Sequence, residues 1–156
     1  MGELLERKIS REKGSFKSPI KIEIQDNKIC SAFAGRYFRN VKNTESPEWL
    51  KNKLKSIGLR PISALVDITN FVMYDENRPL HVYDADKIDG KIIVRKASDG
   101  ESFLALDEKD YHLKNGMCVI ADEKKVLGLG GIMGGESTGC STCLLYTSDA
   151  ADDQAS

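Results

Sequence analysis

The sequence predicts a mixed α+β domain, in which two main helices accompany a mostly antiparallel or mixed sheet. Apolar residues recur at helical spacing between Pro47 and Gly58 and again between Pro61 and Tyr74. After Lys91 the pattern changes to short apolar runs separated by Asp-Gly and Asn-Gly turns, as expected of short strands. With 156 residues, 40% hydrophobic and 30% charged, the chain suits one such domain with a core, or a piece of something larger.

Composition and charge exclude several classes of protein. No apolar run approaches the roughly 20 residues that span a bilayer, and the N-terminus alternates charges where a signal peptide would be apolar. We therefore expect a cytoplasmic protein with no membrane contact. Residues 1–60 hold 14 Lys and Arg against 7 Asp and Glu, which fits either a polyanionic partner or lysines on solvated helices.

The four cysteines predict no metal site. Cys30 and Cys118 lie in apolar, strand-like runs, where a reduced buried thiol is the ordinary outcome in the cytoplasm. Cys140 and Cys143 form a lone CxxC, with no second pair and no histidine at ligand spacing. We therefore expect no zinc there.

The first part of the chain is predicted to be a linker followed by two strands. Residues 1–17 contain too few apolar side chains to belong to a core. Residues 20–24 alternate Ile with polar side chains, which predicts a half-buried strand that turns at Asp26-Asn27. A second strand is expected over residues 30–41. Its aromatic and basic side chains suit either stacking on RNA or packing against the next helix; they are Phe33, Arg36, Tyr37, Phe38 and Arg39.

A strong helix-start signal follows at Ser46-Pro47-Glu48. Ser46 suits the N-cap, Pro47 the first helical position and Glu48 the positive end of the helix dipole. The helix is expected to end at Gly58, a natural C-cap. Its buried side is predicted to carry Trp49, Leu50, Leu54 and Ile57.

The stretch from Arg60 to Ile88 is where we expect the chemistry. Arg60-Pro61 stops the first helix and Ser63 can cap a second one. The core-facing side of this second helix is predicted to carry Ile62, Leu65, Ile68, Thr69, Val72 and Met73.

The opposite side of the second helix is polar, carrying Ser63, Asp67, Asn70 and Tyr74. A bland surface helix would carry Lys and Glu there instead. We expect Ser63 and Asp67 to bond neighbouring loops and Asn70 to belong to a contact face. Residues 75–77 break the helix, and Arg78-Pro79 leads into a strand near residues 80–83, which places Asn70, Arg78 and His81 in one short unit.

Three further strands are expected around residues 92–94, 103–106 and 117–120. Beyond them, Val126 to Ser137 has five glycines in eight positions. Such a backbone can approach a ligand closely or form a tight turn packed under the sheet, and the residues alone do not choose between the two. It is not a recognised phosphate loop, because Met133 occupies the sixth position of the motif that starts at Gly128, where a glycine is required, and no lysine follows a glycine there.

The order of these motifs carries a resemblance. SPEWLKNKLKSIGLRPISALVDITNFVM, RPLHVYDADKI, the GE and LD of GESFLALD, VIAD and GLGGIMGG follow one another over residues 20–142. This order resembles the central B3/B4 domain of bacterial phenylalanine–tRNA ligase β subunits. The resemblance implies an α/β fold that hydrolyses tyrosine mistakenly attached to phenylalanine tRNA, while aminoacylation occurs in the α subunit of an (αβ)2 enzyme.

The resemblance also implies partners and cofactors. The expected partners are phenylalanine tRNA, in its mischarged tyrosyl form, and the α subunit of the heterotetramer, with no role for DNA. ATP and Mg²⁺ belong to the whole enzyme, and no cofactor is expected in this fragment.

Site residues follow from the same resemblance. The family's editing-pocket positions correspond here to Arg60, Thr69, Asn70, Pro79, His81 and Gly135. We expect catalytic roles for His81, Asn70 and Thr69, the first two placing the water or the terminal ribose. Substrate binding is expected of Arg60, Pro79, Gly134 and Gly135, the amides of the glycine pair holding the amino-acid end. An activated ester needs a placed water and a polarised carbonyl but no protein nucleophile.

The chain departs from the family after the glycine-rich motif. The family continues into a strand and a helix with a glutamate that reads the tyrosine hydroxyl, whereas this chain runs CLLYTSDAADDQAS from Cys143. That run resembles translated read-through of a sequencing adapter. We therefore predict a linker over residues 1–17, a C-terminally truncated editing-like domain over residues 18–142, and an unrelated, disordered tail over residues 143–156.

Two other functions stay open at this point. One is a free-standing deacylase built on the same domain. The other is a non-catalytic module that binds RNA or acts as a scaffold between subunits.

Overall fold

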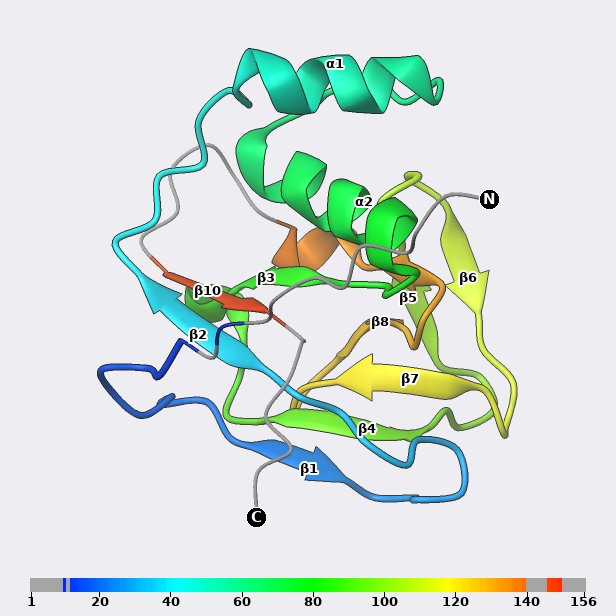
Figure 1. Cartoon of the computed structure of the whole chain (residues 1–156). Helices are drawn as coiled ribbons and strands as arrows, with labels where there is room; N and C mark the ends of the chain where they lie inside the picture. The colour runs from blue at the N-terminus through cyan, green and yellow to red at the C-terminus, as the bar shows by residue number, and fades with distance from the viewer. Residues whose placement is uncertain (1–9, 11, 140–145, 150–156) are drawn as a thin grey trace, which may run out of the picture.

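The computed structural model describes residues 10, 12–139 and 146–149, and places a pair of helices over one side of several small sheets (Figure 1). The helices are α1 (Glu48–Ser56) and α2 (Ala64–Glu76), with the 3-10 helices η1 (Ala85–Lys87) and η2 (Glu136–Thr138). The strands are β1 (Ile22–Ile24), β2 (Arg36–Arg39), β3 (Val82–Asp84), β4 (Ile92–Lys96), β5 (Ser102–Leu104), β6 (Asp110–His112), β7 (Cys118–Ala121), β8 (Val126–Leu129), β9 (Met133–Gly134) and β10 (Tyr146–Asp149).

The main sheet has five strands in the order β1-β4-β7-β8-β9. β1 runs parallel to β4, and each of the other neighbours is antiparallel. The predicted α+β class and mostly antiparallel, mixed sheet are therefore confirmed.

A second sheet, in the order β2-β10-β3, lies between the helices and the main sheet (Figure 1). Both of its pairs are antiparallel, and Asp149 of β10 is level with Arg36 on one side and Val82 on the other. β10 falls within residues 143–156, the segment expected to be disordered. Residues 143–145 and 150–156 lie outside the described residues, and the division into domains stays a prediction.

Two clusters of buried apolar side chains hold the sheets together. One packs the β5–β6 hairpin on the main sheet through Phe103, Leu113 and Val119. The other packs β3 on the main sheet, through Tyr83, Ile92, Ile120 and Leu127. Because Tyr83 belongs to this core, the first residues of β3 are fixed relative to β8.

The first helix begins one residue later than its sequence signal suggests. Pro47, not Ser46, is the N-cap, and no side chain caps the helix. The Ser46 hydroxyl instead donates to the Asp67 carboxylate, at 2.5 Å. The helix ends as expected, with Gly58 at a φ of +82° just beyond it.

The predicted buried faces of the helices are partly wrong. Leu50 is buried as expected, but Trp49 on the same helix is 55% exposed. Ile62, predicted on the core-facing side of the second helix, is 70% exposed. Asp67, predicted on its polar side, is fully buried. Asp67 accepts hydrogen bonds from Ser46 and from the Ile62 amide, so the expectation that it bonds neighbouring loops is confirmed.

The strand predictions differ from the structure mainly in length. The strand expected over residues 30–41 is limited to β2, and Cys30 lies before it as a half-buried free thiol. β6 has no strong sequence signal because its central Tyr111 is flanked by Asp110 and His112. Cys140 and Cys143 lie outside the described residues.

Candidate functional site

His81 directly precedes β3 and faces the glycine-rich hairpin. Strand alternation puts His81 and Tyr83 on the same face, and their ring centroids are 6.1 Å apart. A Cβ added to Gly134 would lie 3.5 Å from His81 Nδ1 and 3.2 Å from Leu106 Cδ1. The hairpin backbone therefore approaches the imidazole closely because residue 134 has no side chain.

Burial sets the protonation state of His81. Its half-buried position lowers the pKa of the imidazole from the ordinary value of 6.5, since a low-dielectric surrounding disfavours the charged form. The lowered pKa favours the neutral ring at pH 7, and a neutral imidazole can accept a hydrogen bond from water or from a hydroxyl group.

The glycine-rich hairpin is packed from both sides. A Cβ on Gly128 would lie 2.7 Å from the Met133 carbonyl oxygen, and one on Gly135 would lie 2.7 Å from the Leu127 carbonyl oxygen. The Gly135 amide donates to that same Leu127 carbonyl at 2.6 Å. This bond occupies the amide that the resemblance assigns to the amino-acid end of the substrate, so Gly135 serves the close packing of β8 on β9.

The two adjacent glycines should respond differently to alanine. Gly135→Ala places a methyl group against backbone and is expected to lower the free energy of unfolding by about 2 kcal/mol. Gly134→Ala meets the ends of two side chains, so we expect a loss below about 1 kcal/mol together with a displaced His81. Urea unfolding of both variants, followed by circular dichroism, checks this order, and equal losses would contradict it.

The other predicted site residues lie on α2 and on the loops beside it. Arg60 is exposed between α1 and α2, and Pro79 is exposed in the loop from α2 to β3. Thr69 donates its hydroxyl to the Val66 carbonyl one turn earlier in α2, at 2.8 Å. In the described part of the chain, no hydrogen bond joins Asn70 or any of these side chains to His81.

The segment after His81 is tied to the segment after the glycines. Asp84 is buried, accepts from the Asp86 amide and pairs with Lys87, whose Nζ donates to the Gly139 carbonyl at 3.0 Å. These bonds connect η1 to η2. They hold the two backbone segments that flank the site at a fixed separation.

Sequence reasoning missed two neighbours of His81, Tyr83 and Leu106. The alternation in His81-Val82-Tyr83 was the available signal for the first. Tyr83 is buried, its hydroxyl has no hydrogen-bond partner among the described residues, and burial raises the pKa of the phenol. No local pattern indicates Leu106, which reaches the site because its amide donates to the Gly134 carbonyl.

Removing the unpartnered hydroxyl should not harm the fold. For Tyr83→Phe we expect a free energy of unfolding equal to the parent or higher by up to about 1 kcal/mol, because a buried polar group without a partner destabilises the folded state. Thermal unfolding measures this. A clearly lower melting temperature would show that the hydroxyl has a partner in solution.

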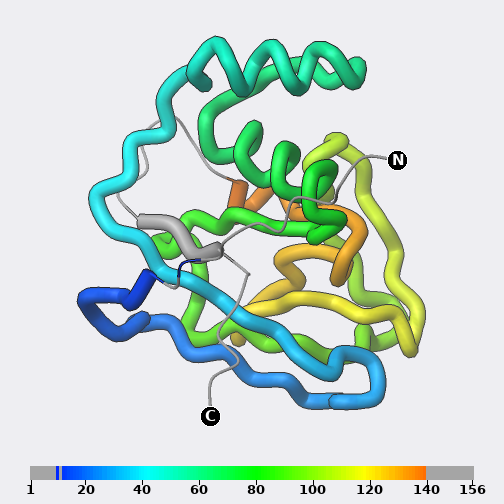
Figure 2. Tube along the Cα trace, viewed as in Figure 1, coloured from blue at the N-terminus to red at the C-terminus, as the bar shows by residue number. Residues whose placement is uncertain are grey.

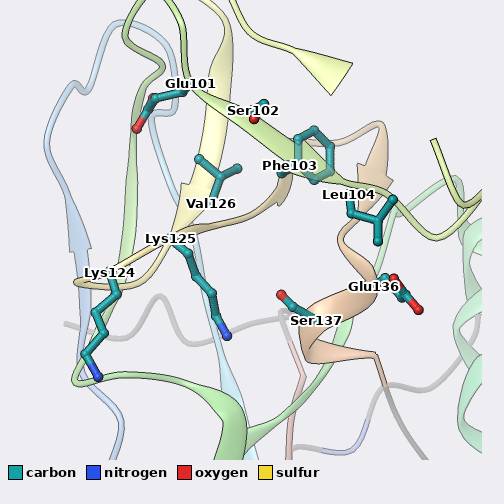
Figure 3. A pocket seen from close by; sticks show the side chains of 9 residues that line it. All are labelled: Glu101, Ser102, Phe103, Leu104, Lys124, Lys125, Val126, Glu136 and Ser137. Atoms are coloured by element: carbon teal, nitrogen blue, oxygen red, sulfur yellow. The ribbon is translucent and has the colours of Figure 1, made fainter. Parts of the chain in front are cut away.

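A separate hollow of about 460 Å³ lies beside the β5–β6 hairpin (Figure 3). Lys125 and Ser137 line it, but His81 and Gly134 do not. Lys124 at its rim is paired with Asp89. Over residues 12–139, no three His, Cys, Asp or Glu side chains gather to hold a metal ion, and no helix in the described residues is long and apolar enough to cross a membrane.

A family model described as the B3/4 domain matches residues 29–143. The chain belongs to the B3/4 domain family. The phenylalanine–tRNA ligase β subunits of Bradyrhizobium diazoefficiens and Nitrobacter winogradskyi are each 54% identical to it over 140 residues. That alignment covers 90% of this B3/4 chain but only 18% and 17% of the two relatives, so the chain spans less than a fifth of their length.

A solved structure shows the same fold. It is an N-terminal fragment of the phenylalanyl-tRNA synthetase β subunit from Pyrococcus horikoshii, which matches with a TM-score of 0.63 at 16% identity. The match covers 90% of this chain and 45% of that one. Together these matches confirm the resemblance to B3/B4 domains of the ligase β subunit.

Proposed function

We propose that this B3/4 domain is part of a phenylalanine–tRNA ligase β subunit and hydrolyses tyrosine from mischarged phenylalanine tRNA. The observation that carries the proposal is the half-buried His81 imidazole beside the tightly packed glycine hairpin, where a Cβ on Gly134 would lie 3.5 Å from its Nδ1. In the whole enzyme, the α subunit, ATP and Mg²⁺ would supply aminoacylation in the cytoplasm.

The geometry suits ester hydrolysis. A neutral imidazole can orient a water molecule or the terminal ribose hydroxyl by accepting its proton in a hydrogen bond. The backbone at Gly134 lies close beside the ring, and Asn70 and Thr69 on α2 complete the proposed catalytic set. Arg60 and Pro79 are the proposed substrate contacts on the surrounding loops.

Editing is needed because the synthetic site of such a ligase cannot select phenylalanine over tyrosine with enough accuracy. An apolar pocket built for phenylalanine cannot strongly reject an analogue that only adds a hydroxyl, so a second site is needed that removes tyrosine after it is attached.

A chimeric ligase tests the proposal. Residues 20–142 of this chain would replace the aligned segment of the Bradyrhizobium diazoefficiens β subunit, which would be co-purified with its α subunit. We expect the chimera to release tyrosine from tyrosyl-tRNA(Phe) at least about ten-fold faster than phenylalanine from phenylalanyl-tRNA(Phe). Equal rates at the level of the uncatalysed reaction would refute the proposal.

The exposed apolar side chains of the helical layer favour a second, scaffolding function. Trp49, Ile57, Ile68 and Tyr74 are all exposed, and α2 has no buried apolar residue. Large apolar side chains that gather on an exposed layer are normally covered by a partner surface. In the chimera, Ile68→Asp would weaken association with the α subunit or with the rest of the β subunit if the module is a scaffold, and would leave assembly unchanged if editing is its main role.

A further inference from the structure

The hollow beside the β5–β6 hairpin is separate from the candidate site and has a chemistry of its own. Three parts of the chain line it, which Figure 2 shows in yellow-green, gold and orange; they are residues 101–104, 124–126 and 136–137. Its volume of about 460 Å³ lies within the range of small-molecule sites, about 300 to 1,000 Å³. Phe103 and Val126 give it an apolar wall, and Leu104, which is 41% exposed, leaves apolar surface open to a ligand.

Two of the charged side chains around the hollow are neutralised by neighbours. The Glu101 carboxylate accepts from both terminal nitrogens of the Arg95 guanidinium, at 2.9 and 2.7 Å. The Lys124 ammonium pairs with Asp89 at 2.6 Å. The Lys125 ammonium differs, because it forms neither a hydrogen bond nor an ion pair with any of the described residues. One positive charge on the lining therefore has no counter-charge in the described part of the chain.

The turn between β7 and β8 holds Lys125 in position. The buried Asp122 carboxylate accepts from the Lys124 and Lys125 amides, at 2.8 and 2.7 Å, and so fixes the turn. From there the half-buried Lys125 side chain extends toward Ser137, whereas Lys124 points in another direction (Figure 3). The Ser137 hydroxyl has no hydrogen-bond partner among the described residues. An unpaired ammonium and an unpaired hydroxyl therefore face the same part of the hollow.

The balance of charge on the lining selects the charge of the ligand. One ammonium and one hydroxyl can both donate hydrogen bonds to a group that carries a single negative charge. Glu136 also lines the hollow; its carboxylate is unpaired among the described residues and points away from Lys125 (Figure 3). It would repel a second negative charge on the ligand. A carboxylate therefore fits better than a phosphate monoester, which carries close to two negative charges at pH 7.

We propose that this hollow binds a small organic carboxylate with an apolar body. The carboxylate accepts hydrogen bonds from the Lys125 ammonium and the Ser137 hydroxyl. The apolar body covers Leu104 and the wall formed by Phe103 and Val126, as in other small-molecule sites where a few polar groups orient a largely apolar ligand. The site goes beyond the editing function, because its lining includes none of the proposed catalytic or substrate-binding residues.

Benzoate and benzamide are matched probes for this site, because they have nearly the same shape and only benzoate is charged. Each is titrated into the isotope-labelled 156-residue chain at pH 7, and the amide chemical shifts are followed by NMR. We expect benzoate to bind with a Kd on the order of 1 mM, typical of a ligand with few atoms, and to shift the amides of residues 124–126 and 136–137. Benzamide should bind at least about ten-fold more weakly, because it forms no ion pair with Lys125.

Two neighbouring lysines allow a matched pair of variants. Lys125→Met keeps a long, unbranched side chain without its charge and should raise the Kd for benzoate at least about ten-fold. Lys124→Met removes a charge that is already paired with Asp89, and should leave the Kd within about two-fold of the parent. Ser137→Ala removes one hydrogen-bond donor and should raise the Kd about three-fold.

Several results would overturn carboxylate binding by the hollow. They are the absence of a saturable shift with benzoate, equal binding of benzamide, tighter binding of inorganic phosphate, an equal loss in Lys124→Met and Lys125→Met, and shifts centred on His81 instead of the hollow.

Carboxylate binding and the proposed function can fail separately. His81 does not line the hollow, so His81→Ala should leave the Kd for benzoate unchanged. If the chimeric ligase hydrolyses no tyrosyl-tRNA while the benzoate results hold, the editing role fails and carboxylate binding stands. If the chimera hydrolyses tyrosyl-tRNA but Lys125→Met binds benzoate like the parent, the editing role stands and carboxylate binding by the hollow is overturned.

Discussion

Replacing Asp67 with alanine is expected to lower the free energy of unfolding by about 3 kcal/mol. Asp67 is fully buried in α2, and its two carboxylate oxygens accept from the Ser46 hydroxyl at 2.5 Å and from the Ile62 amide at 2.8 Å. Alanine leaves the buried Ser46 hydroxyl without an acceptor, and the part-buried Ile62 amide also loses its hydrogen bond. These bonds join α2 to the segment before α1 and to the connection between α1 and α2. Without them, we expect the packing of the two helices to loosen.

Urea unfolding measures this loss, with circular dichroism as the signal. Asp67→Asn keeps one acceptor oxygen and should destabilise less than alanine does. Asp86→Ala, which removes an exposed carboxylate, should change the free energy by less than about 0.5 kcal/mol. If Asp67→Ala unfolds like Asp86→Ala, the buried carboxylate does not organise the helical layer.

Replacing His81 with alanine should slow tyrosyl-tRNA hydrolysis by the chimeric ligase about 100-fold, the lower end of the range for loss of a proton-accepting side chain. The reason is positional, since the imidazole lies against Gly134 with no competing hydrogen bond among the described residues. Single-turnover hydrolysis of tyrosyl-tRNA(Phe) gives the rate.

Two measurements separate this catalytic loss from a folding defect. The melting temperature of the His81→Ala chimera should remain near that of the parent, because a half-buried side chain at a strand start contributes less than a core residue. Aminoacylation by the α subunit should also continue. A hydrolysis rate equal to the parent's would remove His81 from the mechanism.

Local sequence patterns predicted where the helices lie, but not which of their faces are buried. Residues 47–58 and 61–74 show clear helical periodicity with start and stop residues, so both helices were predictable, although α2 continues two residues further, to Glu76. Periodicity does not show which segment of the protein, if any, packs against each face of a helix. Ile62 and Trp49 are exposed although their spacing indicates a core, because the described chain provides no surface to cover them.

The site illustrates the same limit. His81 could be named from the resemblance, and Tyr83 from alternation along β3. The contact between His81 and Gly134 joins residues more than fifty positions apart. The glycine pattern allows a tight turn there, but no local pattern shows which segment packs against it. The role of Gly135 differs from expectation for a related reason: its amide is used by Leu127, and only the register of the sheet reveals that.

The pH dependence of hydrolysis tests the central claim most directly. Burial lowers the pKa of His81 below 6.5, so the neutral imidazole persists to a lower pH than in an unfolded chain. Hydrolysis by the parent chimera, divided by that of His81→Gln at the same pH, should fall as the pH drops through the lowered pKa of His81, where the ring gains a proton. A ratio that rises as the pH is lowered would contradict a proton-accepting His81 at the centre of this site.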